Sequence, residues 1–244
     1  MSRRRGRGGG PFVLGVAALA LGGLGLFRAA TVAEPGGAAG PSPALAAPQA
    51  PVAADALPTP ARAVLPAFGG AGGVALRLPT PAVITVMYHE ASSSKAMAQR
   101  PLGTCAKSEN RTKFHCPPDT AAVPTYTVMS SRGRGTAATS AADVVVPAAE
   151  PLTAPISGTV VQVKRYLLYG VHPDIRLAIR PDGPDTRLRV VVIHLRDVRV
   201  VPGQRVEVSV TPIGIARAFS FRSQVDDYLP GGRPHVHVEV KRVG

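Results

Sequence analysis

Two histidines and a glutamate alternate with valines near the end of the chain, in Pro234-His235-Val236-His237-Val238-Glu239-Val240. A period of two is typical of a β-strand, whose successive side chains point to opposite faces. His235, His237 and Glu239 are therefore predicted to share one face, with the valines toward the core. Neutral histidine is the commonest metal ligand, and histidine also exchanges protons near neutral pH. For an isolated His-x-His the sequence favours an exposed face with two solvated histidines, and the rest of the chain raises the odds of a metal or acid–base site.

The motif Gly232-Arg233-Pro234-His235-Val236-His237-Val238-Glu239-Val240 resembles the closing motif of the lysostaphin-type (LytM-like) zinc endopeptidases, which cut peptidoglycan peptides. Further fragments resemble the same family in the same order. They are Gly158-Thr159-Val160-Val161, Tyr169-Gly170, Ile193-His194-Leu195, Val201-Pro202-Gly203-Gln204-Arg205-Val206 and Pro212-Ile213-Gly214. The resemblance covers the chain from about Asp143 to the C-terminus.

The resemblance implies a zinc site and assigns its residues. A hydrolytic zinc takes three protein ligands and keeps one position for water, whose pKa it lowers to about 7. By resemblance, Asp143 and His237 are metal ligands, and His194 and His235 are the catalytic histidines. In the family the first ligand is a histidine four residues before the aspartate, and here that position holds Thr139. Glu239, on the histidine face, is a candidate for orienting an imidazole.

A threonine hydroxyl is a poor zinc ligand, so three interpretations stay open. The domain has lost zinc and catalysis and binds peptidoglycan or a partner, or it binds zinc weakly and acts only when tethered, or another histidine completes the site. The spare histidines are His89, His115 and His172. The sequence favours the loss, because each of the three looks like a loop or turn residue. His89 is the most interesting exception, since Tyr88-His89-Glu90 ends a predicted strand.

Residues 1–33 are predicted to be an export signal or a membrane anchor. Four arginines lie within residues 3–7, and the sixteen residues from Phe12 to Phe27 carry no charge. A basic end before an apolar run is typical of an export signal, with the arginines left in the cytoplasm. The run is shorter than the ~20 residues of a spanning helix, and Thr31-Val32-Ala33 offers a cleavage site. We favour a retained anchor, and either interpretation predicts that the remainder is extracytoplasmic.

Residues 34–81 are rich in Ala, Pro and Gly, with ten prolines among 48 residues. Such a composition predicts a disordered linker, because it offers little apolar surface to bury. The alternative is a collar on the domain in which Leu65, Phe68 and Leu76 dock locally.

Residues 82–142 are predicted to form an extension of the folded domain. It begins with a strand over 82–88, and a short helix around 94–99 and a strand over 126–130 are expected. Cys105 and Cys116 lie in its polar central loop. In an exported domain a disulfide between them is the natural interpretation, and two free thiols are the alternative.

Residues 143–244 are predicted to form the peptidase-like β domain. The expected strands, separated by Pro and Gly turns, are 143–146, 158–166, 175–179, 187–195, 204–208, 212–216 and 236–240. With no long helical period, the fold class is all-β around a twisted antiparallel sheet. The resemblance implies a sandwich-hybrid core of the lysostaphin type.

The formal charge of +13 indicates a polyanionic neighbour such as a cell wall or an anionic membrane. Nucleic acid is the weaker choice and is not expected as a partner, because no recognisable binding motif occurs and aromatic residues make up only 5%. We expect a membrane-tethered protein that binds peptidoglycan stem peptides or regulates other cell-wall enzymes, with catalysis reduced or lost. The alternatives are an active zinc endopeptidase that cuts peptidoglycan cross-links and an efflux-adaptor-like structural β domain.

Overall fold

The computed structural model describes residues 63–118 and 122–244, and within them the protein is all-β. The predicted anchor at 1–33 and the linker as far as residue 62 lie outside the described residues. No helix in the described ranges is long and apolar enough to cross a membrane. One short 3₁₀ helix, η1 (Gln224–Asp227), accompanies the strands.

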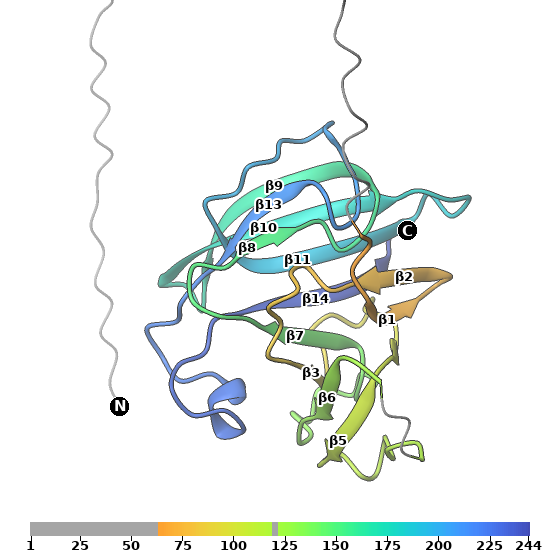
Figure 1. Cartoon of the computed structure of the whole chain (residues 1–244), viewed down its shortest axis with the longest axis vertical. Helices are drawn as coiled ribbons and strands as arrows, with labels where there is room; N and C mark the ends of the chain where they lie inside the picture. The colour runs from red at the N-terminus through yellow and green to blue at the C-terminus, as the bar shows by residue number, and fades with distance from the viewer. Residues whose placement is uncertain (1–62, 119–121) are drawn as a thin grey trace, which may run out of the picture. The chain divides into compact units, whose positions relative to one another are not determined.

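Eleven of the fourteen strands in the described ranges form one large sheet, and Figure 1 shows its strands running from β9 to β5. Its order is β12-β9-β10-β11-β14-β7-β3-β6-β5, with β13 paired to β11 and β8 paired to β13. All pairings are antiparallel except β3–β6 and β5–β6. The bounds are β3 Thr85–His89, β5 Thr104–Ser108, β6 Thr125–Val128, β7 Ala141–Val145, β8 Pro151–Thr153, β9 Gly158–Leu168, β10 His172–Pro181, β11 Leu188–Arg196, β12 Arg205–Val206, β13 Pro212–Ala216 and β14 His235–Arg242.

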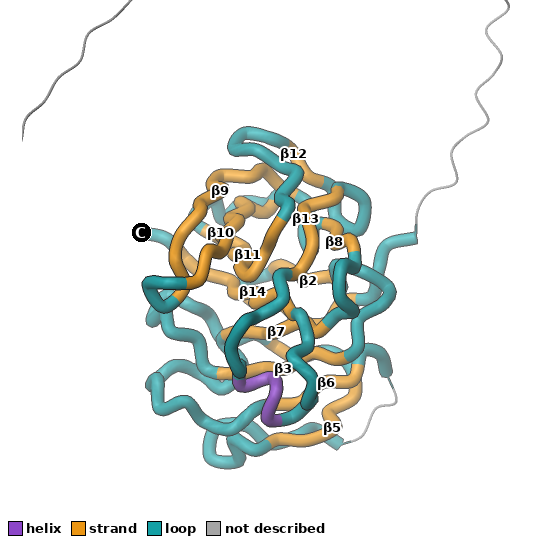
Figure 2. The backbone as a smooth tube through the Cα atoms, turned by 90° about the vertical axis from the view of Figure 1, so that its left-hand side faces the viewer, coloured by secondary structure: helices purple, strands orange, loops and turns teal. Residues whose placement is uncertain are grey.

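Strand β14 lies in the middle of this sheet, between β11 and β7 (Figure 2). The three valines of the motif, Val236, Val238 and Val240, are at most 1% exposed and belong to the main core. Because side chains alternate along a strand, burying the valines places His237 and Glu239 together on the other face. The structure confirms the prediction that the valines face the core and that His237 and Glu239 share the opposite face.

A separate three-stranded sheet covers part of the core. It consists of β1 (Ala67–Ala71), β2 (Val74–Arg77) and β4 (Arg100–Pro101), in the order β2-β1-β4. Phe68 and Leu76 of this hairpin are fully buried, and the Tyr88 hydroxyl donates a hydrogen bond to the Phe68 carbonyl at 2.6 Å. The disordered linker predicted over 34–81 therefore does not extend through residues 67–77. These residues dock on the core, as in the alternative interpretation.

The predicted strands are present with shifted ends, and the Cys105–Cys116 disulfide is confirmed. The prediction of a short helix around 94–99 is wrong. In its place the chain turns, Ala96 forms a β-bridge with Lys241, and the amide of Met97 donates to the carbonyl of Val240 at 2.8 Å. The amide of Met97, which a helix would satisfy internally, is satisfied here by the neighbouring strand β14.

Candidate metal centre and its cleft

Three side chains from three adjacent strands converge on one point. They are His89 at the end of β3, Asp143 in β7 and His237 in β14. His237 pairs directly with Asp143 across β14 and β7, and Met87 of β3 pairs with Asp143 on its other side, so His89 is the diagonal neighbour of Asp143. His237 Nδ1 lies 2.9 Å and His89 Nε2 lies 3.1 Å from Asp143 Oδ1. This buried group could hold a metal ion.

Outer hydrogen bonds orient both imidazoles. His89 Nδ1 lies 2.9 Å from the carbonyl oxygen of Glu90, which can only accept, so Nδ1 carries the proton. His89 Nε2 is then a lone-pair nitrogen, and it is buried with no hydrogen-bond partner in the described chain. His237 Nε2 lies 2.9 Å from Glu239 Oε1, which leaves Nδ1 facing Asp143. Metal-binding histidines are held in this way, with one nitrogen anchored and the other directed at the ion.

The three converging atoms are His89 Nε2, Asp143 Oδ1 and His237 Nδ1, and the electrostatics of the cluster favour a positive charge between them. Burial opposes ionisation of Asp143, but the nearby histidines hold the pKa of its carboxyl well below the usual value. Burial also acts to lower the pKa of His237, but hydrogen bonds to Asp143 and Glu239 raise it to about 9. A proton on His237 can therefore supply the charge, and a divalent cation would displace that proton.

Thr139 does not take part in this cluster. Its hydroxyl is buried and donates a 2.7 Å hydrogen bond to the carbonyl of Gln99. The preference for His89 as an ordinary loop residue is wrong, because His89 is fully buried at the end of a strand. His115 and His172 do not belong to the cluster. The signal for His89 was its place at the end of a β-branched run, but no local pattern shows that this strand pairs with β7.

The two expected catalytic histidines lie beside the cluster. His235 Nε2 is 4.0 Å from Asp143 Oδ2, and the rings of His194 and His235 are 5.7 Å apart. Burial lowers the pKa of His235 to about 4, against the attraction of Asp143, so this imidazole is neutral at neutral pH. Its Nδ1 lies 3.1 Å from the carbonyl of Arg233 and donates to it, which leaves Nε2 as an acceptor.

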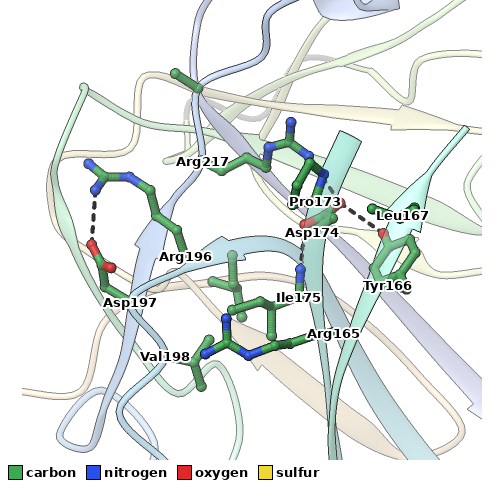
Figure 3. Close-up of a pocket in the computed structure, with 12 residues that line it drawn as sticks. Arg165, Tyr166, Leu167, Pro173, Asp174, Ile175, Arg196, Asp197, Val198 and Arg217 are labelled. Atoms are coloured by element: carbon green, nitrogen blue, oxygen red, sulfur yellow. Dashed lines mark hydrogen bonds and ion pairs between the residues drawn. The ribbon is translucent and has the colours of Figure 1, made fainter. Parts of the chain in front are cut away.

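His194 is held by a buried aspartate that sequence reasoning missed. Its Nδ1 lies 2.6 Å from Asp174 Oδ2, and Asp174 also accepts hydrogen bonds from the Tyr166 hydroxyl and the amide of Ile175. Figure 3 shows Tyr166 and Ile175 directed at this carboxylate. His194 also has a φ of 68°, a conformation that costs energy in a residue with a side chain and is concentrated at functional sites. Asp174 lies at the start of β10, where the sequence shows only a turn-like Pro-Asp.

A cleft of about 350 Å³ adjoins the cluster. Its lining combines His194, His235 and His237 with aromatic and basic side chains, namely Tyr169, Phe219, Phe221, Arg132, Arg134 and Arg222. The Phe219 ring lies 4.6 Å from the ring of His235 and 4.9 Å from that of His194. The structure thus brings together Asp143, His194, His235 and His237, the four site residues named from the sequence, and adds His89.

Comparison with known proteins adds no family name to this geometry. No family model matches the chain, and no curated protein matches it. The resemblance to the lysostaphin-type peptidases therefore rests on the residues themselves.

Proposed function

We propose that the protein is an extracytoplasmic, metal-dependent peptidase of the lysostaphin type that hydrolyses peptide bonds in peptidoglycan stem peptides. The observation that carries the proposal is the convergence of His89 Nε2, Asp143 Oδ1 and His237 Nδ1 beside a cleft that contains two further histidines. It favours the active enzyme over the expected loss of catalysis, because β3 supplies the ligand missing at Thr139. The wall substrate, the membrane tether and the sandwich-hybrid core rest on the sequence resemblance and the basic, apolar N-terminus.

The donor set fits zinc. Two imidazole nitrogens and one carboxylate oxygen form a three-ligand set of the kind found in hydrolytic zinc sites, which keep a fourth position for water. When bound there, zinc would acidify that water and polarise the scissile carbonyl. The anchoring of His89 by the Glu90 carbonyl and of His237 by Glu239 pre-sets the tautomers that such binding needs.

His194 and His235 can handle protons on the cleft side. His235 is neutral and presents Nε2 as an acceptor, so it can take a proton from water. His194 points Nδ1 at Asp174, whose carboxylate offsets the charge that the ring acquires when Nε2 takes up a proton. The proton that His235 takes from water can then pass to the leaving amine, and a protonated His194 can donate a hydrogen bond to the oxyanion.

Zinc content and hydrolysis test the proposal on the full chain. We expect about one zinc per chain by metal mass spectrometry, lost in His89→Ala and His237→Ala and retained in the control Thr139→Ala. Fragment release from purified peptidoglycan should be abolished by Asp143→Ala. A folded wild type that takes up no zinc, or a His89→Ala variant that retains it, would contradict the assignment.

A second candidate is a wall-binding domain that does not cut. It is favoured by the fact that His237, with its pKa raised to about 9, can bridge Asp143 and Glu239 through protons alone. Lys241 Nζ lies 2.5 Å from Glu239 Oε2 and extends this series of charged contacts. In that case the cleft would hold stem peptide and regulate other wall enzymes. A zinc-free wild type that still sediments with peptidoglycan would support this candidate.

A further inference from the structure

One guanidinium of the cleft, that of Arg132, lies beside the metal centre in a long ion pair with Asp143. The Arg132 side chain is only 19% exposed, and its Nη2 lies 3.7 Å from Asp143 Oδ2, beyond hydrogen-bond distance. Its Nε donates to the side-chain oxygen of Gln224, a neutral group.

The other two arginines of the cleft are already engaged. Arg134 Nη1 donates to the Glu90 carbonyl at 3.1 Å, and Arg222 pairs with Asp227 at 2.6 Å. Arg222 is also 75% exposed, so water screens its charge. Arg134 and Arg222 are exposed, whereas Arg132 is half-buried beside Asp143, so Arg132 is the lining arginine placed to meet an occupant next to the metal centre.

The charges around Arg132 favour an anionic occupant. Asp143 is the one carboxylate among the lining residues, and one of its oxygens lies 2.9 Å from His237 Nδ1 and 3.1 Å from His89 Nε2. A divalent cation there would make the cleft more positive still. The main-chain amides of Arg132 and Arg134 donate to the Glu90 carboxylate at 3.0 and 2.9 Å, which fixes the loop that carries the guanidinium. A fixed, partly desolvated guanidinium is well suited to bind a carboxylate.

The aromatic lining of the cleft indicates the rest of the ligand. Tyr169 and Phe221 have ring centroids 5.5 Å apart, and Phe219 and Phe221 are 5.2 Å apart. Tyr169 is 73% exposed, so this cluster offers apolar surface at the entrance. A peptide with an aliphatic stretch beside a carboxylate matches both the aromatic rings and the arginine.

We propose that Arg132 binds a free carboxylate of the peptide next to the scissile bond, so that the cleft selects peptides that carry one there. The inference rests on the proposed function and names a specificity determinant for it. Arg132 holds the peptide through its guanidinium and takes no part in proton transfer.

The test compares purified peptidoglycan with the same material after its carboxyl groups are amidated with carbodiimide and ammonia. The wild-type full chain should release fragments from the free-carboxyl form roughly tenfold faster, as expected for one charge-assisted pair. In Arg132→Gln this ratio should fall to about one, while Arg132→Lys should retain part of it. The control Arg205→Gln makes the same charge change at a remote arginine paired with Asp182 and should keep the wild-type ratio. Zinc content and thermal unfolding verify that each variant is folded and loaded.

Each remaining outcome has a defined meaning. Equal wild-type rates on the two preparations would overturn the inference and leave the proposed function intact. An Arg132→Gln variant that slows both reactions equally would overturn it as well, because the arginine would then act on the transition state. If zinc-loaded wild type cuts neither preparation, the proposed function fails. The inference is then tested by co-sedimentation of the wild type and of Arg132→Gln with each of the two peptidoglycan preparations. A preference for the free-carboxyl form that Arg132→Gln abolishes would support it, and equal binding would overturn it.

Discussion

His237 owes its orientation to Glu239, two positions along the same strand and on the same face. The carboxylate accepts from Nε2 and is itself paired with Lys241, so the free nitrogen of the ring is directed at Asp143. A negative acceptor also makes the imidazole a better donor to a metal. The role of His237 therefore depends on a residue that need not touch the ion.

Replacing Glu239 with Gln should weaken zinc binding roughly 10- to 100-fold, because the outer hydrogen bond loses its charge. Competition with a chromophoric chelator measures the change in Kd. Glu207→Gln, at an exposed position, is the matched control and should leave the affinity unchanged. An unaltered Kd in Glu239→Gln would show that the carboxylate does not support the site.

Asp174 supports His194 in the same way that Glu239 supports His237. Asp174→Asn should reduce the turnover number by about 10²- to 10³-fold, since His194 loses the carboxylate that stabilises its charged form. Zinc content should not change, because Asp174 contacts none of the three ligands. Steady-state kinetics on peptidoglycan fragments, together with metal analysis, separates this result from a general loss of structure. A variant that loses zinc in proportion to activity would contradict the assigned role.

At the scale of elements, the end of β3 is held by a buried carboxylate. Glu90 follows His89 directly, its side chain is fully buried, and it contacts Lys113, Ser131 and the amides of Arg132 and Arg134. Burial acts to raise the pKa of Glu90, but these hydrogen bonds lower it from 4.5 to about 2. This arrangement ties the loop that carries Arg132 to the strand that supplies His89.

The lowered pKa of Glu90 predicts a pH-dependent contribution to stability. Its stabilising effect should be complete above the unfolded pKa of 4.5 and lost as the pH falls toward 2. Glu90→Gln should lower the free energy of unfolding by about 2 kcal/mol at neutral pH, and the difference from wild type should shrink between pH 4 and pH 2. Urea titrations across this range measure it. A difference that is constant with pH would exclude the ionised carboxylate as the cause.

The β1–β2 hairpin gives a prediction about packing. Phe68 is fully buried against the main core, so Phe68→Ala should lower the free energy of unfolding by about 3 kcal/mol. Val64→Ala, at a side chain that is 56% exposed, should change it by less than about 0.5 kcal/mol. Equal, small effects in urea unfolding would mean that the hairpin is not part of the cooperative core.

At the scale of the whole described chain, one sheet unites two segments that the sequence separates. Residues 82–142 supply β3, β5, β6 and the first two residues of β7, and residues 143–244 supply the rest of the large sheet. The candidate metal centre lies at their junction, because His89 comes from the first segment and Asp143 and His237 from the second. The peptidase-like segment therefore contains only two of the three ligands.

A fragment of residues 143–244 should accordingly fail to bind zinc and fail to fold as a stable monomer. Removing β3 exposes the backbone edge of β7, which carries Asp143, and removes the apolar cover that Val86 and Tyr88 give the core. Circular dichroism, size-exclusion chromatography and metal analysis of the fragment and the full chain test this. A folded, zinc-loaded fragment would show that His89 is dispensable.

The all-β class, most strand positions, the disulfide and the face shared by His235, His237 and Glu239 could all be predicted from the sequence. These features follow from local patterns, chiefly the period of two and the spacing of turn residues and cysteines. Tertiary structure decided the features that depend on pairing between distant segments. It placed His89 beside Asp143 through the β3–β7 register, brought Asp174 to His194, and docked residues 67–77 on the core. Composition and local periodicity show which residues a strand can bury, but not which other strand it will pair with, and each of these contacts depends on that choice.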